Sequence, residues 1–134
     1  MATMSAADRR AQAKLVYDAY IDECPSRKLL DTLSDKWVTL ILNALSGGQR
    51  RYSDLARAIA GVSQKMLTQT LRRLERDGLV TRAVTPSVPV RVDYELTALG
   101  VSLLPVVAAI KGWAEAHIED VEDARGRYDA ASRT

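Results

Sequence analysis

The sequence predicts a mainly α-helical domain with one small β-hairpin, in the α+β class. Apolar residues recur at helical spacing over most of the chain, between residues typical of helix ends. Residues 79–85 are rich in β-branched side chains, and residues 90–96 alternate as a half-buried strand does. With 134 residues, 47% of them hydrophobic, the chain has the size of one domain with a buried core.

The first third of the chain is expected to form three helices. The first covers residues 5–22, where apolar residues fall on one stripe. A residue before proline is pushed out of the helical region, so Pro25 separates this helix from a short one over residues 25–33. Residues 34–35, Ser and Asp, are an N-cap pair for a strongly apolar third helix over residues 36–46, which we expect at the centre of the domain.

Two short helices with a tight, glycine-containing turn between them come next. Ser53 is the expected N-cap of the first, and Ser63 that of a helix over residues 64–77, which Gly78 ends. Three residues of the first helix are expected to face the core: Leu55, Ala56 and Ile59. This arrangement is a helix-turn-helix, and the two-stranded hairpin directly after it would be a wing.

A last helix is expected from Thr97 to about residue 122. It is apolar nearly all round between residues 101 and 110, so it should pack on more than one side, with a second subunit as one partner. Pro105 predicts a bend, and the charged tail over residues 123–134 is expected to fray. Because no run of 18 apolar residues and no apolar leader is found, we expect no membrane span, no secretory signal and a cytoplasmic protein.

Charge is distributed unevenly along the chain. The net charge is only +2, but residues 50–91 hold nine Lys and Arg against three acidic residues, while residues 115–134 are acidic. The basic middle is a candidate nucleic-acid footprint. An ordinary solvated surface would give the same charge pattern.

The helix over residues 64–77 has two different faces. At about 100° per residue, its leucines form one stripe and four long polar side chains share the opposite face. A recognition helix needs such a face, because Lys, Gln and Arg bond base edges in the major groove. Arg51 and the wing residue Arg91 suit phosphate or minor-groove contacts, although both would also be ordinary solvated residues. The expected DNA-contacting residues are Arg51, Ser63, Gln64, Lys65, Thr68, Gln69, Arg72, Arg73, Arg76 and Arg91.

Several short motifs along the chain are specific in combination. They are Cys24-Pro25, Lys36-Trp37, Val62-Ser63-x-Lys65-x-Leu67-Thr68-x-x-Leu71, Gly78-Leu79-Val80-x-Arg82 and Tyr94-x-Leu96-Thr97-x-x-Gly100. Together they resemble the HxlR-type winged helix-turn-helix regulators of bacteria, relatives of the MarR regulators, over about residues 22–114. Asp35 and Tyr52 depart from the usual Gly and Phe. The resemblance implies a homodimer that joins through its N- and C-terminal helices and binds pseudo-palindromic operators.

The leading hypothesis is therefore a sequence-specific, homodimeric transcriptional regulator, expected to be a repressor, that binds double-stranded DNA. Its expected parts are a dimerisation extension over residues 1–23, a winged domain over 24–97, a dimerisation helix over 98–122 and the charged tail. The alternative is a winged-helix module that binds protein and not DNA. We expect no enzyme and no cofactor, since no catalytic motif is found, and one Cys with one His cannot complete a four-ligand zinc site.

The single cysteine, Cys24, suggests an effector response. By the resemblance, several such regulators carry an oxidant- or electrophile-sensing cysteine at this position. A helix starting at Pro25 would stabilise its thiolate, whereas Asp22 and Glu23 would oppose it. The alternative is a small buried hydrophobic residue near the dimer interface.

Overall fold

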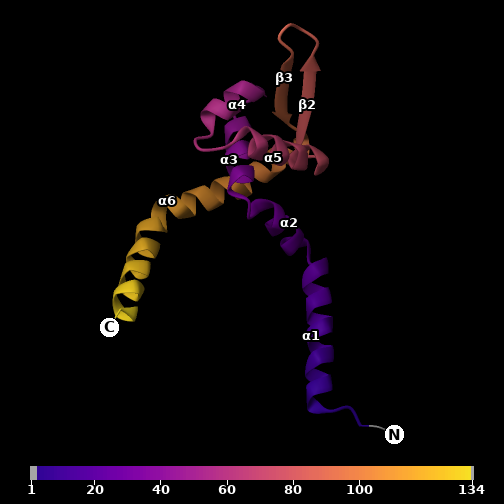
Figure 1. The fold of residues 1–134 in the computed structure, drawn as a ribbon, viewed down its shortest axis with the longest axis vertical. Helices are drawn as coiled ribbons and strands as arrows, with labels where there is room; N and C mark the ends of the chain where they lie inside the picture. The colour runs from indigo at the N-terminus through magenta and orange to yellow at the C-terminus, as the bar shows by residue number, and fades with distance from the viewer. Residues whose placement is uncertain (1–2, 134) are drawn as a thin grey trace.

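Over the described residues the fold consists of six helices and a small sheet (Figure 1). The structure, a computed structural model, describes residues 3–133, apart from the side chains of residues 21 and 22. The elements follow one another as α1 (Ala6–Glu23), α2 (Pro25–Leu33), α3 (Lys36–Leu45), β1 (Arg50–Arg51), α4 (Tyr52–Ala58), α5 (Gln64–Arg76), β2 (Val80–Thr85), β3 (Arg91–Leu96) and α6 (Ala98–Ser132).

Capping residues set several helix ends, as predicted. The Asp35 carboxylate accepts a hydrogen bond from the Trp37 backbone N–H at 2.9 Å and starts α3. The Ser63 hydroxyl accepts one from Met66 N–H at 3.1 Å and starts α5. Gly78 follows α5 with a φ of +75°, a conformation that ends a helix and that other residues adopt only at a cost.

The start of α4 differs from the prediction. The N-cap is Arg51 and not Ser53, because Arg51 is held in an extended conformation by pairing with β3. The helix therefore begins two residues earlier than an N-cap at Ser53 predicts, at Tyr52. Of the three residues expected to face the core, Leu55 and Ile59 are buried, but Ala56 is exposed.

The sheet has three antiparallel strands in the order β1-β3-β2, and not two as predicted. β2 and β3 form the expected wing hairpin, with Val80 opposite Leu96 and Thr85 opposite Arg91. The added strand, β1, places Arg50 opposite Tyr94 and Arg51 opposite Asp93. Two residues are too few to show strand alternation, so only the tertiary pairing reveals β1.

The core lies between α3, α4, α5 and the sheet, and α6 covers one side of it. As expected, α3 is central, with Val38, Ile41 and Leu42 fully buried. α6 packs on α3 and contributes Val107. The remaining buried hydrophobic residues are Leu45, Leu55, Ile59, Leu67, Leu71, Leu74, Leu79, Val80 and Tyr94.

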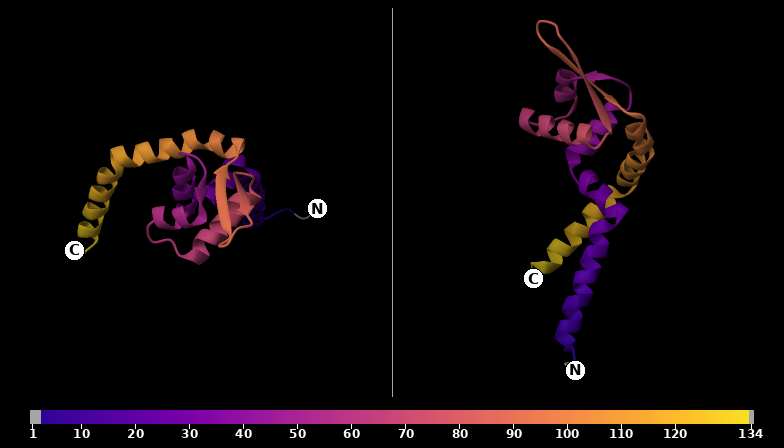
Figure 2. Two further views of the ribbon diagram at one scale, coloured as in Figure 1. Left: turned by 90° about the horizontal axis from the view of Figure 1, so that it is seen from above. Right: turned by 90° about the vertical axis from the view of Figure 1, so that its right-hand side faces the viewer.

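Helix α6 is longer than predicted. It continues past residue 122 to Ser132, contrary to the expected fraying, because the Ala and Arg residues of the tail favour helix. The helix also runs through Pro105 without a break, and its visible change of direction falls later, in the yellow part of Figure 2. By length and composition α6 could cross a membrane, contrary to expectation. However, its Gly100 and Val107 are packed inside the domain.

Two helical segments extend away from the domain. α1 and the second half of α6 project in different directions in Figures 1 and 2. Apolar side chains are exposed on both helices, with Val16 and Tyr20 of α1 and Trp113 near the middle of α6 each at least 59% accessible. Both arms thus present apolar surface that nothing in a single chain covers.

Candidate nucleic-acid interface

Helix α5 separates a buried face from an exposed polar face, as its sequence predicts. Leu67, Leu71 and Leu74 are at most 1% exposed and anchor the helix on the core. On the opposite face the four long polar side chains are all exposed to solvent: Lys65, Gln69, Arg72 and Arg76. A duplex lying against this face would meet donors and cations before any apolar group.

The N-terminal end of α5 is fixed to α4 through one tyrosine. The Tyr52 hydroxyl lies 3.2 Å from the Gln64 carbonyl oxygen and 3.0 Å from the Thr68 hydroxyl. Thr68 is half-buried, so its hydroxyl serves this contact, whereas the side chain of Gln64 is exposed. The sequence did not show the contact, since it joins residues on two different helices.

The C-terminal end of α5 is fixed to α2. The half-buried Arg73 donates from Nη2 to the Asp31 carbonyl oxygen at 2.6 Å, at the end of α2. Beside it, the Thr32 hydroxyl donates to the Asp77 carboxylate at 3.4 Å. Arg73 was expected on the DNA-facing surface, but the structure joins it to α2.

One charged pair joins the wing to the helix-turn-helix, and a second lies within the wing. Arg82 of β2 lies 3.7 Å from Glu75 at the end of α5. Arg91 lies at the start of β3, where its Nε donates to the Asp93 carboxylate at 2.8 Å. Asp93 is only 5% exposed, and its Oδ1 has no hydrogen-bond partner among the described residues. Sequence reasoning missed Asp93, although Arg91-x-Asp93 on a strand places both side chains on one face.

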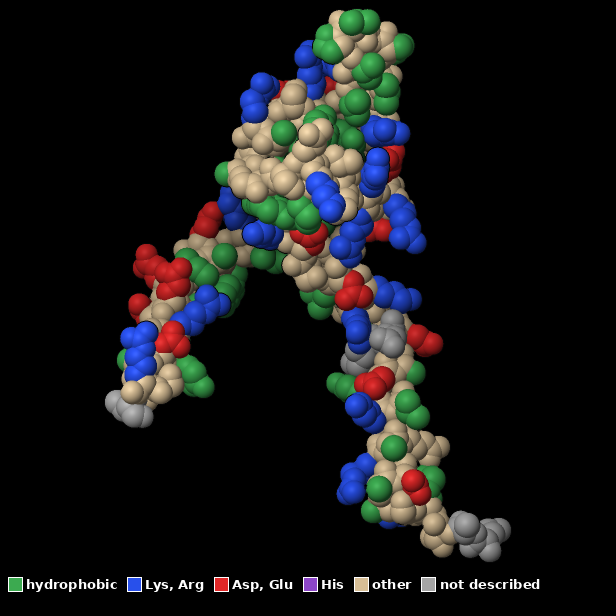
Figure 3. Space-filling view, in the orientation of Figure 1, with side chains coloured by type: hydrophobic (Ala, Val, Ile, Leu, Met, Phe, Trp, Pro, Cys, Tyr) green, Lys and Arg blue, Asp and Glu red, His purple; other side chains and the backbone are tan. Residues whose placement is uncertain are grey.

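Cations gather over the winged domain. Figure 3 shows blue side chains over the central domain and the base of the wing, while red and blue ones are mixed along the two arms, α1 and α6. Arg51 of β1 and Ser63 at the start of α5 are exposed. The distribution matches the basic middle read from the sequence.

Cys24 occupies the N-cap position of α2, directly before Pro25. The backbone N–H of Arg27, followed by that of Ser26, lowers the pKa of the partly exposed Cys24 thiol. These groups act as dipoles toward the sulfur, since the side chain makes no capping hydrogen bond of good geometry. Of the two acidic neighbours expected to oppose the thiolate, the side chain of Asp22 lies outside the described residues. Among the described residues, no cluster of three or more His, Cys, Asp or Glu could hold a metal ion.

Comparison with known proteins identifies the family. The profile of the HxlR-like helix-turn-helix family matches residues 32–122, which include α3 to α5, the wing and most of α6. The chain belongs to the HxlR-like family. It is a transcriptional regulator of the helix-turn-helix type, a class of proteins that bind DNA.

Two transcriptional regulators are similar to the chain in sequence or structure. An HTH-type transcriptional regulator of Escherichia coli, YtfH, is 45% identical over 102 residues, which are 76% of this chain and 81% of that protein. The structure of a putative transcriptional regulator, ytfH from Salmonella typhimurium, superposes with a TM-score of 0.71 at 44% identity, over 78% of this chain and 94% of that one. The resemblance inferred from the motifs is thus confirmed.

A redox regulator is also among the similar HxlR-like structures. HypR in its reduced form superposes with a TM-score of 0.70 at 35% identity, over 75% of this chain and 99% of that one. HypR in its oxidised form is similar as well, at 38% identity and a TM-score of 0.65, over 69% of this chain and 96% of that one.

Proposed function

We propose that this HxlR-like protein is a repressor that acts in the cytoplasm as a homodimer on a pseudo-palindromic operator, without catalysing a reaction. The observation that supports the proposal most strongly is the exposed face of α5, formed by Lys65, Gln69, Arg72 and Arg76. The first half of this helix would enter the major groove, with Gln64 and Ser63 near its start. In this proposal Arg73 and the Thr68 hydroxyl position the helix, because both are engaged within the protein.

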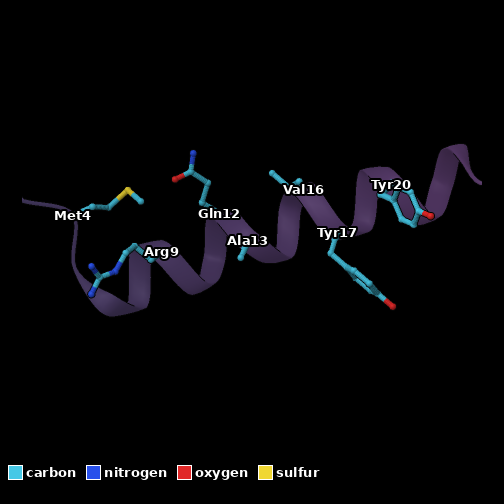
Figure 4. A pocket seen from close by; sticks show the side chains of 7 residues that line it. All are labelled: Met4, Arg9, Gln12, Ala13, Val16, Tyr17 and Tyr20. Carbon is cyan, nitrogen blue, oxygen red and sulfur yellow. The ribbon is translucent and has the colours of Figure 1, made fainter.

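The exposed arms support the homodimer. A shallow groove on α1 is lined by Met4, Val16, Tyr17 and Tyr20, among others, and no second element lies over these side chains in Figure 4. α6 exposes Val106, Ile110 and Trp113. Exposed apolar surface of this kind is typical of an interface, so we assign α1 and α6 to dimerisation. Two copies of α5 would then read two half-sites related by two-fold symmetry.

Measured DNA binding tests the proposal. Selecting bound fragments from genomic DNA would supply an operator, whose affinity is then compared with that of unrelated duplexes by fluorescence anisotropy. We expect affinity for both to fall steeply with salt, because phosphate contacts release counterions.

Alanine variants distinguish recognition of the bases from contact with the DNA phosphate backbone. Gln69→Ala and Arg72→Ala should bring operator and unrelated DNA closer together in affinity, each by about 1–3 kcal/mol of discrimination. Arg51→Ala should weaken both similarly. Unchanged operator preference in the α5 variants would refute the assigned reading face. No DNA binding by the wild type would favour the protein-interaction alternative.

We also propose that Cys24 makes DNA binding responsive to oxidants or electrophiles. Its lowered pKa increases the thiolate fraction, which is the reactive form, and HypR gives a redox precedent in a similar structure. α2 carries Cys24 at its first end and holds Arg73 of α5 at its last, so a shift of α2 would reach the recognition helix.

The cysteine is tested with diamide or a quinone. Either reagent should release operator DNA from the wild type and not from Cys24→Ser, and a reducing thiol should restore binding after diamide. An equal response of both proteins would refute the sensing role and leave the DNA-binding proposal intact.

A further inference from the structure

A buried carboxylate of the small sheet contacts one arginine and lies opposite a second on the neighbouring strand. Asp93 is in the middle strand, β3, two residues after Arg91 and directly opposite Arg51 of β1. Residues two apart on a strand, and directly opposed residues on paired strands, share one face of a sheet. Tyr94 points to the other face, into the core. Arg51, Asp93 and Arg91 therefore lie on one face of the sheet, and these three residues are called the cluster below.

The contacts of this cluster are asymmetric. Asp93 Oδ2 accepts from Arg91 Nε at 2.8 Å, and its side chain is 6% exposed, while that of Arg91 is 44% exposed. Asp93 Oδ1 is buried and accepts no hydrogen bond from any described residue. A buried carboxylate oxygen without a donor is costly, so its retention beside two arginines needs a reason.

The cluster lies beside a groove between the wing and the helix-turn-helix. The groove has a volume of about 350 Å³ and is lined by residues 51–53 on one side and residues 89–92 on the other. Arg51 and Arg91 thus reach it from opposite sides. Because Arg91 uses Nε for Asp93, its terminal nitrogens remain available to a second acceptor, in the planar fork geometry that suits a phosphate.

We propose that Asp93 is a positioning residue that makes Arg51 and Arg91 one binding site for a phosphate of the DNA backbone. Its Oδ2 fixes the direction of the Arg91 guanidinium, and its Oδ1 is the acceptor available to Arg51 across the strand pair. The wing and β1 would then hold the same phosphate, which sets the position of the wing relative to α5. This inference rests on the proposed DNA binding and adds a residue to it.

The proposal is testable because charge alone and loss of positioning predict opposite effects on DNA binding when the Asp93 carboxylate is removed. Asp93→Asn deletes a negative charge beside two cations, so simple attraction would strengthen DNA binding. Loss of positioning would weaken it. Glu95→Gln is a matched control, because Glu95 is exposed on the same strand and the same face and the change removes the same charge.

The experiment measures the dissociation constant of the full-length chain for a mixed-sequence duplex of about 30 base pairs, long enough for two half-sites, at several salt concentrations. We expect Asp93→Asn to raise the dissociation constant about tenfold and to reduce the salt slope by about one, as for a lost phosphate contact. Arg91→Ala should have a similar effect, and combining the two changes should add little. Glu95→Gln should bind as the wild type does or more tightly.

A conservative variant covers the case in which Asp93→Asn fails to fold, as judged by circular dichroism. Arg91→Lys keeps the charge at an exposed position but cannot bond Asp93 and a phosphate through one planar fork. It should raise the dissociation constant several-fold. Wild-type affinity in Arg91→Lys, or unchanged or tighter binding by a folded Asp93→Asn, would overturn the inference. A wild type that does not bind duplex DNA would instead overturn the proposed function.

Discussion

At the scale of the residue, the fold depends on polar groups placed within the core. Tyr94 of β3 is 8% exposed and lies against the helix-turn-helix. Burial raises the pKa of its phenol, and Arg82 opposes this effect. The neutral phenol is therefore the form that the folded protein prefers.

The raised pKa of Tyr94 predicts a loss of stability in alkali. The folded state holds the phenol proton of Tyr94 more tightly than the unfolded chain does. The contribution of Tyr94 to the free energy of unfolding is therefore full below the unfolded pKa of about 10, and it is lost as the pH rises through the pKa of the folded state. Urea unfolding between pH 8 and 11, by circular dichroism, should show a steeper fall in the free energy of unfolding for the wild type than for Tyr94→Phe. Equal slopes would contradict the prediction.

At the scale of the element, α6 approaches the end of the helix-turn-helix closely at Gly100. A Cβ added to Gly100 would lie 2.2 Å from the Leu79 carbonyl oxygen. That oxygen accepts the Thr97 backbone N–H at 3.0 Å, so it has little freedom to move. The contact fixes where α6 leaves the winged domain.

Replacing each of two glycines of α6 by alanine should therefore change the free energy of unfolding in opposite directions. Gly100→Ala should lower the free energy of unfolding by about 1–3 kcal/mol or more, because the backbone must shift. Gly112→Ala adds its Cβ to open space and should raise stability by about 0.5–1 kcal/mol. Urea unfolding of both variants tests the pair, and a stabilising Gly100→Ala would show that the approach is not tight.

The contact between α5 and α2 gives a second prediction at this scale. Arg73→Ala removes a charged donor from the Asp31 carbonyl and should cost about 1–2 kcal/mol of stability. Arg76→Ala, one turn along on the exposed face, should change stability by less than about 0.5 kcal/mol. Thermal and urea unfolding would show the difference, and equal losses would mean that the bond to Asp31 is of no consequence.

At the scale of the whole molecule, the two apolar arms require a partner. Analytical ultracentrifugation should find a homodimer of twice 14.7 kDa at micromolar concentration. Val16→Asp on α1 and Trp113→Glu on α6 each place a charge on apolar surface and should shift the protein toward the monomer. They should also weaken operator binding, since one monomer reads one half-site.

A matched surface change keeps this test specific. Lys111→Asp alters the charge of α6 at an exposed position, beside Glu115, without entering the apolar surface. It should leave the dimer in place. Monomeric wild-type protein would contradict the assignment of the arms to dimerisation.

The helices and the exposed polar face of α5 were largely predictable from local sequence. The cap residues Asp35 and Ser63 and the glycine at 78 act within one turn of their own position, so α3 and α5 were placed to within a residue or so. The leucine stripe of α5 likewise follows from helix geometry alone, and it determined which side chains would be exposed.

The remaining features needed the tertiary structure, because each joins residues far apart in the chain. Strand β1 exists through its pairing with β3, and that pairing also moved the start of α4. The sequence predicts that Arg73 and Thr68 contact DNA, but in the structure they form hydrogen bonds to α2 and α4 within the protein. The position of Asp93 opposite Arg51 is visible only when β1 pairs with β3. The sequence by itself determined most helices, the wing strands and the chemistry of the exposed face of α5, because their causes are local. The tertiary structure decided which charged side chains remain exposed and which are already bound within the protein, because those contacts join distant parts of the chain.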